Sequence, residues 1–206
     1  MQPIITRRAI FGLLAVSIGA LLAYSHTSAQ ATTVSPDQAA WDALRSGGHV
    51  MLIRHARAPG TFDPPGFTLG DCSTQRNLSE EGRAQALRLG ELVRAMGIAV
   101  DQVQSSQWCR CVDTAKLAFG TNLVKTYAPL NSPTQLSAAQ RQAHTQTLRK
   151  DVQAFSIKKS KAPANRVFVT HMFNIQDITG ESVMEGEILV VRGDASGVRV
   201  VGRIAQ

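Results

Sequence analysis

The chain has 206 residues, of which 44% are hydrophobic and 18% charged, a balance typical of a folded globular protein. Lys and Arg number 22 against 15 Asp and Glu, and the resulting formal net charge of +7 favours an anionic ligand. Because these basic residues are scattered and only 5% of residues are aromatic, the composition argues against a nucleic-acid-binding protein.

The first 31 residues have the pattern of an export signal. Arg7-Arg8 precede an apolar run over 9–24, and small residues then form a cleavage-site pattern. The arginine pair also resembles a twin-arginine signal. The alternative is an uncleaved anchor, but the run is short for a membrane span. We therefore expect a signal peptide at 1–31, one domain at 32–206 without stable membrane insertion, and a periplasmic or secreted protein.

A buried strand at Val50–Ile53 follows an expected helix over 35–46, which Ser35 would cap. The strand ends in Arg54 and His55. Ligands of open α/β sheets bind beyond the carboxyl ends of strands, so these two side chains are candidates for anion binding. A neutral histidine among fixed positive charges is also a usable nucleophile. The alternative is a strand that ends at the surface in ordinary polar residues.

A long loop over 58–76, rich in proline and glycine, comes next and is suited to form one wall of a site. Ser79 then begins a helix that ends at Gly97. A short strand over 100–106 leads into a helix over 107–119, which places Arg110 in the first helical turn. Helix N-termini favour anions, and an arginine there can bind a phosphate through two parallel hydrogen bonds. The alternative is a surface Arg110 paired with Asp113.

The remaining elements alternate between strands and helices. We expect a strand over 123–127, a helix over 134–155, a basic linker over 158–161, a strand over 167–171 and a hairpin of 188–192 with 198–204. The strand over 167–171 also ends in a histidine, His171. The chain contains no phosphate-binding P-loop, no GxGxxG motif and no aspartate-rich metal motif, so we predict neither cofactor nor metal.

Three cysteines allow one disulfide and leave one thiol in an oxidising compartment. Cys72 lies in the long loop, and either Cys109 or Cys111 is its expected partner, so the pairing stays open. The spacing of the three residues is not that of a usual zinc site. The other alternative is three separate thiols.

Four segments together resemble the histidine phosphatase superfamily, which includes phosphoglycerate mutases and acid phosphatases. The strand and Arg54-His55-Ala56 are similar to its Arg-His-Gly signature, and 77–82 is similar to its Leu-Ser-x-x-Gly helix start. Ser105–Ala115 resembles its Ser-Ser-x-x-x-Arg-x-x-x-Thr-Ala block, and Val169–His171 its second histidine. This resemblance implies a three-layer α/β/α sandwich around a mainly parallel sheet.

The resemblance also implies a mechanism. His55 would attack phosphorus and carry a transient phosphohistidine, while Arg54, Arg110 and His171 stabilise the phosphoryl oxygens. Arg57 stands where the family commonly has glutamate, and would add a further substrate-binding cation. The expected partner is a small phosphorylated substrate.

The general acid departs from the family pattern. Asn131 occupies the place where one branch has a glutamate, and an amide cannot donate a proton as an acid. Met172 occupies the place of the carboxylate of the other branch. Asp63, Asp71 and Glu181 are the candidates to replace them.

Two functional classes follow. The first is an exported, metal-independent phosphatase that hydrolyses a small phosphomonoester, and we favour it because all the predicted pocket residues are present. The second is an envelope-associated module that binds phosphate without turnover. A mutase is less favoured because free glycolytic intermediates are not expected outside the cytoplasm. The sequence leaves the substrate and the oligomeric state open.

Overall fold

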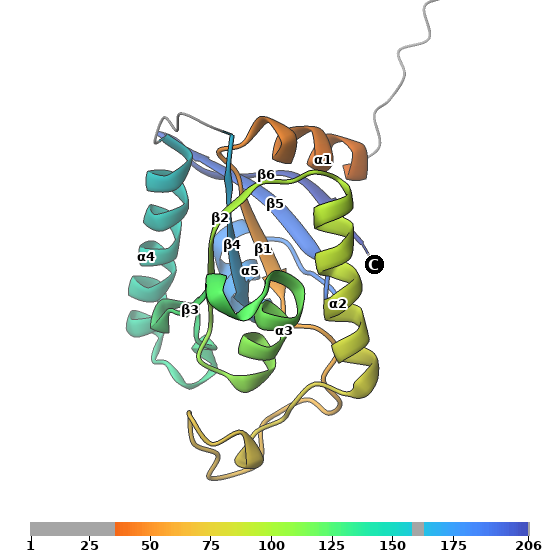
Figure 1. The fold of residues 1–206 in the computed structure, drawn as a ribbon. Helices are drawn as coiled ribbons and strands as arrows, with labels where there is room; N and C mark the ends of the chain where they lie inside the picture. The colour runs from red at the N-terminus through yellow and green to blue at the C-terminus, as the bar shows by residue number, and fades with distance from the viewer. Residues whose placement is uncertain (1–35, 158–162, 206) are drawn as a thin grey trace, which may run out of the picture. The chain divides into compact units, whose positions relative to one another are not determined.

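One six-stranded sheet runs through the protein, with the strand order β3-β2-β4-β1-β5-β6 (Figure 1). The computed structural model describes residues 36–157 and 163–205. The strands are β1 (Val50–Arg54), β2 (Val100–Ser105), β3 (Val124–Thr126), β4 (Asn165–Thr170), β5 (Ile188–Asp194) and β6 (Gly197–Ile204). The first four run parallel to one another, whereas β5 pairs antiparallel with both β1 and β6.

Within the described ranges, five α-helices cover the two faces of the sheet (Figure 1). They are α1 (Pro36–Ser46), α2 (Glu80–Ala95), α3 (Cys109–Phe119), α4 (Ala138–Ile157) and α5 (Met172–Thr179). Residues of α1, α2 and α3 share one hydrophobic core with the sheet, and residues of α4 and α5 share the other. This arrangement confirms the predicted three-layer α/β/α sandwich around a mainly parallel sheet.

The sequence of β1 explains why it lies between the two cores. Alternate side chains of a strand point to opposite faces of the sheet. Met51 and Ile53 accordingly pack with α1, α2 and α3, while Val50 and Leu52 pack with α4 and α5. All four side chains are fully buried, as expected for the near-continuous apolar strands of a sheet covered on both sides.

The parallel register brings three strand ends to the same edge of the sheet. Arg54 of β1 is opposite Thr170 of β4, and Ser105 of β2 is opposite Val169. The backbone continues this pairing one residue further, because the His55 amide donates to the Thr170 carbonyl at 3.0 Å. The residues that follow β1, β2 and β4 therefore meet in one place.

Several helices and strands begin or end at other residues than the sequence predicts. The polar helix expected over 134–155 is α4, which begins at Ala138 after a 3-10 turn at Pro133–Gln135. The expected strand over 123–127 shortens to β3, and α3 begins at Cys109 instead of Gln107. Further 3-10 turns occur at Cys72–Thr74, Thr121–Leu123 and Ala128–Leu130. Helix α5, which begins directly after His171, was not predicted from the sequence.

Three predictions fall outside the described residues. They are the export signal at 1–31, the Ser35 cap and the basic linker at 158–161. Ser79, by contrast, caps α2 as predicted, because its side chain accepts a hydrogen bond from the Gly82 amide. No helix in the described ranges is both long and apolar enough to cross a membrane.

Gly90 allows α2 and α3 to pack closely, and we expect its replacement by alanine to destabilise the protein. A Cβ at this position would lie 2.0 Å from the Ala118 carbonyl oxygen, so the helices would have to separate. We expect Gly90→Ala to lower the free energy of unfolding by about 2–3 kcal/mol, despite the higher helix propensity of alanine. Urea denaturation measures this loss. Arg88→Ala, on the exposed face of α2, is the control, and an equal effect of the two changes would contradict the packing argument.

Candidate active site

The two histidines predicted from the sequence lie side by side. His55 follows β1 and His171 follows β4, and their ring centroids are 5.6 Å apart in an edge-to-face arrangement. Each is almost fully buried, with exposed fractions of 2% and 4%. Both line one cavity of about 740 Å³ together with Arg54, Arg57 and Arg110. The structure therefore brings together all five residues that the sequence assigned to the site.

Hydrogen bonding fixes the tautomer of His55. Its Nδ1 atom lies 2.9 Å from the carbonyl oxygen of Ala56. Because a carbonyl only accepts, Nδ1 must carry the proton, and Nε2 keeps its lone pair. Burial lowers the pKa of His55 to about 3, and the positive charges of Arg110, Arg76 and Arg54 act in the same direction, against the opposing effect of the Ala56 carbonyl. His55 is therefore a neutral nitrogen base at ordinary pH.

This low pKa predicts a loss of stability in acid. Unfolded His55 takes up a proton near its ordinary value of 6.5, whereas folded His55 does so only at about 3. Between these values the unfolded chain binds more protons, so stability is full above pH 6.5 and falls as the pH drops toward 3. Each such group contributes up to about 1.4 kcal/mol per pH unit. The free energy of unfolding, measured by urea denaturation from pH 7.5 to 4.5, should fall less steeply with decreasing pH for His55→Gln than for wild type. An equal pH dependence of the two proteins would contradict the prediction.

His171 is held by a polar chain on its far side. Its Nε2 lies 2.9 Å from the Ser106 hydroxyl, which donates to the Asn131 side-chain oxygen at 3.2 Å. That oxygen also accepts from the Gln107 amide at 2.9 Å. Asn131 thus stands behind His171 through Ser106 and does not line the cavity. Burial lowers the pKa of His171 well below its usual value, with further contributions from His55 and Arg110.

A fourth cavity arginine, Arg76, was missed by sequence reasoning. It ends the long loop, and its guanidinium donates to the Gly60 carbonyl at 3.0 Å and to the Ala58 carbonyl. Arg54, Arg76 and Arg110 each have a buried Nε atom that lacks a hydrogen-bond partner among the described residues. No local motif marks Arg76, because only tertiary contacts bring this loop residue to the histidines.

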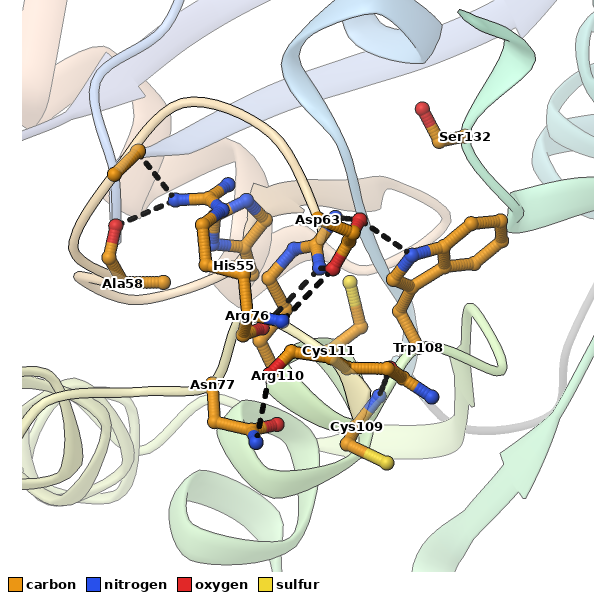
Figure 2. A network of polar contacts seen from close by, with 12 residues as sticks. His55, Ala58, Asp63, Arg76, Asn77, Trp108, Cys109, Arg110, Cys111 and Ser132 are labelled. Atoms are coloured by element: carbon orange, nitrogen blue, oxygen red, sulfur yellow. Dashed lines mark hydrogen bonds and ion pairs between the residues drawn. The ribbon is translucent and has the colours of Figure 1, made fainter. Parts of the chain in front are cut away.

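Asp63 organises the wall of the cavity near Arg110 (Figure 2). Its two oxygens accept from the Arg110 guanidinium at 2.8 and 3.2 Å. They also accept from the Trp108 indole at 3.0 Å and from the Arg76 amide at 2.9 Å. Burial raises the pKa of Asp63, but these hydrogen bonds outweigh burial and leave the pKa below its ordinary value. An ionised carboxylate with this many donors is poorly suited to give up a proton.

The other two acid candidates are wrong. Asp71 is exposed, accepts hydrogen bonds from Ser73 and caps the 3-10 turn at Cys72–Thr74. Glu181 is exposed and pairs with Arg203 at 2.9 Å. Neither residue lines the cavity. Both were chosen from chain position alone, and the folded loops direct them elsewhere.

The remaining cavity carboxylates are bound to arginines. Glu185 lies 3.4 Å from Arg54 and 3.7 Å from Arg76. Glu81, which is exposed, pairs with Arg57 at 2.7 Å. Arg57 itself is 59% exposed at its side chain, so it lies at the rim of the cavity and not beside the histidines in the interior. Arg110, by contrast, pairs with Asp63 and not with Asp113, which pairs with Arg83.

One disulfide ties the long loop to α3. Cys72 is bonded to Cys109, which selects one of the two pairings left open by the sequence. Cys111 is a free, buried thiol 3.6 Å from His171 Nε2, and burial raises its pKa to about 12. The described part of the chain contains no group of three or more His, Cys, Asp or Glu side chains that could hold a metal ion.

Comparisons with known proteins agree with this architecture. Residues 50–129, which include Arg54, His55 and Arg110, match the model of the histidine phosphatase superfamily (branch 1). No curated protein matches the chain in sequence.

Three solved structures share the fold at low sequence identity. A phosphoserine phosphatase mutant from Entamoeba histolytica in complex with phosphoserine is 14% identical (TM-score 0.56), covering 75% of this chain and 95% of its own. YhfR of Bacillus stearothermophilus is 14% identical (TM-score 0.53), and the match covers 75% of this chain and 95% of YhfR. The protein histidine phosphatase SixA complexed with tungstate is 13% identical (TM-score 0.50), and the match covers 76% of this chain and 96% of SixA. The segment matched by the family model and the shared fold both support the histidine phosphatase superfamily.

Proposed function

We propose that the protein is an exported, metal-independent phosphatase that hydrolyses phosphomonoesters through a phosphohistidine on His55. One observation carries the proposal. His55 is a buried neutral histidine whose Nδ1–H is directed to a carbonyl, so the lone pair of Nε2 is free among three arginines and a second histidine. A nucleophile needs such a lone pair, and a phosphoryl group needs such surrounding positive charge.

The proposed reaction has two displacements at phosphorus. The His55 Nε2 lone pair forms a bond to phosphorus while the bond to the leaving oxygen breaks, and that oxygen departs with the electron pair. Water then attacks the phosphorus, the P–N bond breaks, and its electrons return to Nε2. Phosphate leaves with the oxygen of the water, whose protons stay on the phosphate or pass to solvent, and the proton on Nδ1 stays on that nitrogen, hydrogen-bonded to the Ala56 carbonyl.

The surrounding cations would stabilise the transferring phosphoryl group. Arg54 and Arg110 flank His55 in the cavity, and Arg76 adds a third guanidinium. His171, whose Nε2 is held by Ser106, would become charged in the presence of the dianion and then donate from Nδ1 to a phosphoryl oxygen. Arg57 is at the rim, where it would meet the part of the substrate beyond the phosphate.

The leaving group determines which substrates suit this site. Each carboxylate that lines the cavity (Asp63, Glu81 and Glu185) already pairs with an arginine, and an arginine favours the ionised form of its partner. The site therefore offers little acid catalysis. Substrates whose leaving oxygen is a stable anion should turn over best. This scarcity of acid is also the observation that favours the alternative function, a phosphate-binding module without turnover.

Export is supported by two features. The N-terminal 31 residues have the order of charged, apolar and small residues found in export signals. The bond between Cys72 and Cys109 is of a kind that persists in oxidising compartments. Cell fractionation, with the mass of the recovered protein, would show whether the segment is removed.

The function is tested by phosphate release from p-nitrophenyl phosphate and from phosphoserine by the full, oxidised chain, with and without EDTA, from pH 4 to 8. The first substrate has a leaving group that needs little acid, so the missing donor does not conceal the nucleophile. Turnover that resists EDTA supports the phosphatase. A folded protein that binds inorganic phosphate in a calorimeter yet releases none from either substrate would favour the binding module.

A further inference from the structure

An exposed aromatic side chain, Phe62, is part of the cavity lining. Phe62 is 76% exposed, yet it lines the same cavity as His55 and His171. The large exposed hydrophobic residues among the described positions are Phe62, Leu69, Leu87, Leu123 and Met184, and Phe62 is the one among them that lines the cavity. No ring or cation contact in the described structure involves Phe62.

The backbone on both sides of Phe62 is anchored. On one side, the Gly60 carbonyl accepts from the Arg76 guanidinium at 3.0 Å. On the other side, Asp63 accepts from Arg110, Trp108 and the Arg76 amide (Figure 2). Phe62 is therefore presented at the cavity by a fixed segment, and a ligand that contacts its ring would not have to order the loop first.

The lining of the cavity includes further apolar and aromatic residues. Phe67, Met172 and Phe173 also line it, together with the histidines and arginines described above. A volume of about 740 Å³ falls within the range of sites for organic molecules, about 300–1,000 Å³, and far exceeds what a phosphoryl group fills. The cavity therefore has room for an organic group beside the phosphoryl group, and Phe62 is part of its lining.

Resting on the proposed function, we propose that Phe62 determines specificity by contacting the leaving group, and that the substrates are phosphomonoesters of aromatic alcohols. Stacking or edge contact with the Phe62 ring would remove apolar surface of both rings from water. The same substrate class suits the reactive centre, because a phenolate leaves with the electron pair of the broken P–O bond and needs little protonation. Geometry and leaving-group chemistry thus favour the same alcohols.

The test compares an aromatic with an aliphatic substrate. We expect Phe62→Ala to lower kcat/KM for 1-naphthyl phosphate about tenfold, through KM, which corresponds to about 1.4 kcal/mol of lost contact. Phosphoserine hydrolysis and inhibition by tungstate should change less than about twofold, because neither ligand reaches the ring. Phe62→Tyr should retain the preference. Leu69→Ala, in the same loop but away from the cavity, should leave both substrates unaffected.

Binding provides the same discrimination without turnover. In a His55→Ala background, adding Phe62→Ala should weaken calorimetric binding of 1-naphthyl phosphate about tenfold and leave that of inorganic phosphate unchanged. Equal changes for the two ligands, or none, would overturn the role of Phe62. Absence of turnover by wild type on every substrate would instead defeat the proposed phosphatase, and the binding comparison would still decide the role of Phe62.

Discussion

Replacing His55 with alanine is expected to abolish phosphate release, with a loss of at least about 1,000-fold in kcat, as is usual when a nucleophile is removed. The variant lacks the atom that forms the bond to phosphorus in the proposed mechanism. Phosphate release from p-nitrophenyl phosphate measures the loss. Acid-quenched wild type should also carry an added phosphoryl mass on the peptide that contains His55, and the variant should not.

The fold should survive this change. The amide of residue 55 still donates to the Thr170 carbonyl, and the ring faces a polar cavity instead of either hydrophobic core. Circular dichroism and thermal unfolding check this point. His144→Ala is the matched control, because His144 lies in α4 and does not line the cavity; its turnover should be normal. Full activity of a folded His55→Ala protein would contradict the phosphohistidine mechanism.

The second large effect is expected at Arg110. Its guanidinium and the Asp63 carboxylate are 5% and 10% exposed, so Arg110→Met leaves an uncompensated, nearly buried negative charge. Breaking such a pair costs about 3–5 kcal/mol of stability. The same change removes a cation from the phosphoryl site and should lower kcat by about 100-fold or more.

A double variant separates these two effects. Arg110→Met with Asp63→Asn removes the stranded charge, so the free energy of unfolding should recover while turnover does not. Urea denaturation and phosphate release measure the two quantities. Arg83→Met breaks an exposed pair with Asp113, whose side chains are 44% and 39% exposed, and should cost less than about 1 kcal/mol. A double variant as unstable as Arg110→Met alone would contradict this account.

Sequence reasoning was strongest where a local pattern determines position. Val50–Ile53 has to be buried because it is apolar throughout, and parallel strands end at a common edge, so His55 and His171 were bound to meet. Arg110 was recognisable from its place in the first turn of a helix. In each case the residue is within a few positions of the element that orients it.

The loop residues were beyond this reasoning because distant contacts determine their positions. Asp63 meets Arg110 47 positions further along the chain, and Arg76 is turned inward by carbonyls 16 and 18 positions before it. Asp71 and Glu181 were equally plausible carboxylates by sequence, and the fold gave them other partners. Helix α5 was missed because it has only eight residues, although Gly180, with φ of 82°, marks its end.

The disulfide has a consequence for how the chain must mature. Cys109 and Cys111 are two residues apart, so oxidation of an unfolded chain can join Cys72 to either of them with similar ease. The native pairing leaves Cys111 buried and, with its high pKa, unreactive, whereas the wrong pairing would leave the Cys109 thiol free at the start of α3. Thiol-disulfide isomerisation would thus be part of the protein's biogenesis. A thiol-labelling reagent would leave correctly paired molecules unlabelled and would label those with a free Cys109.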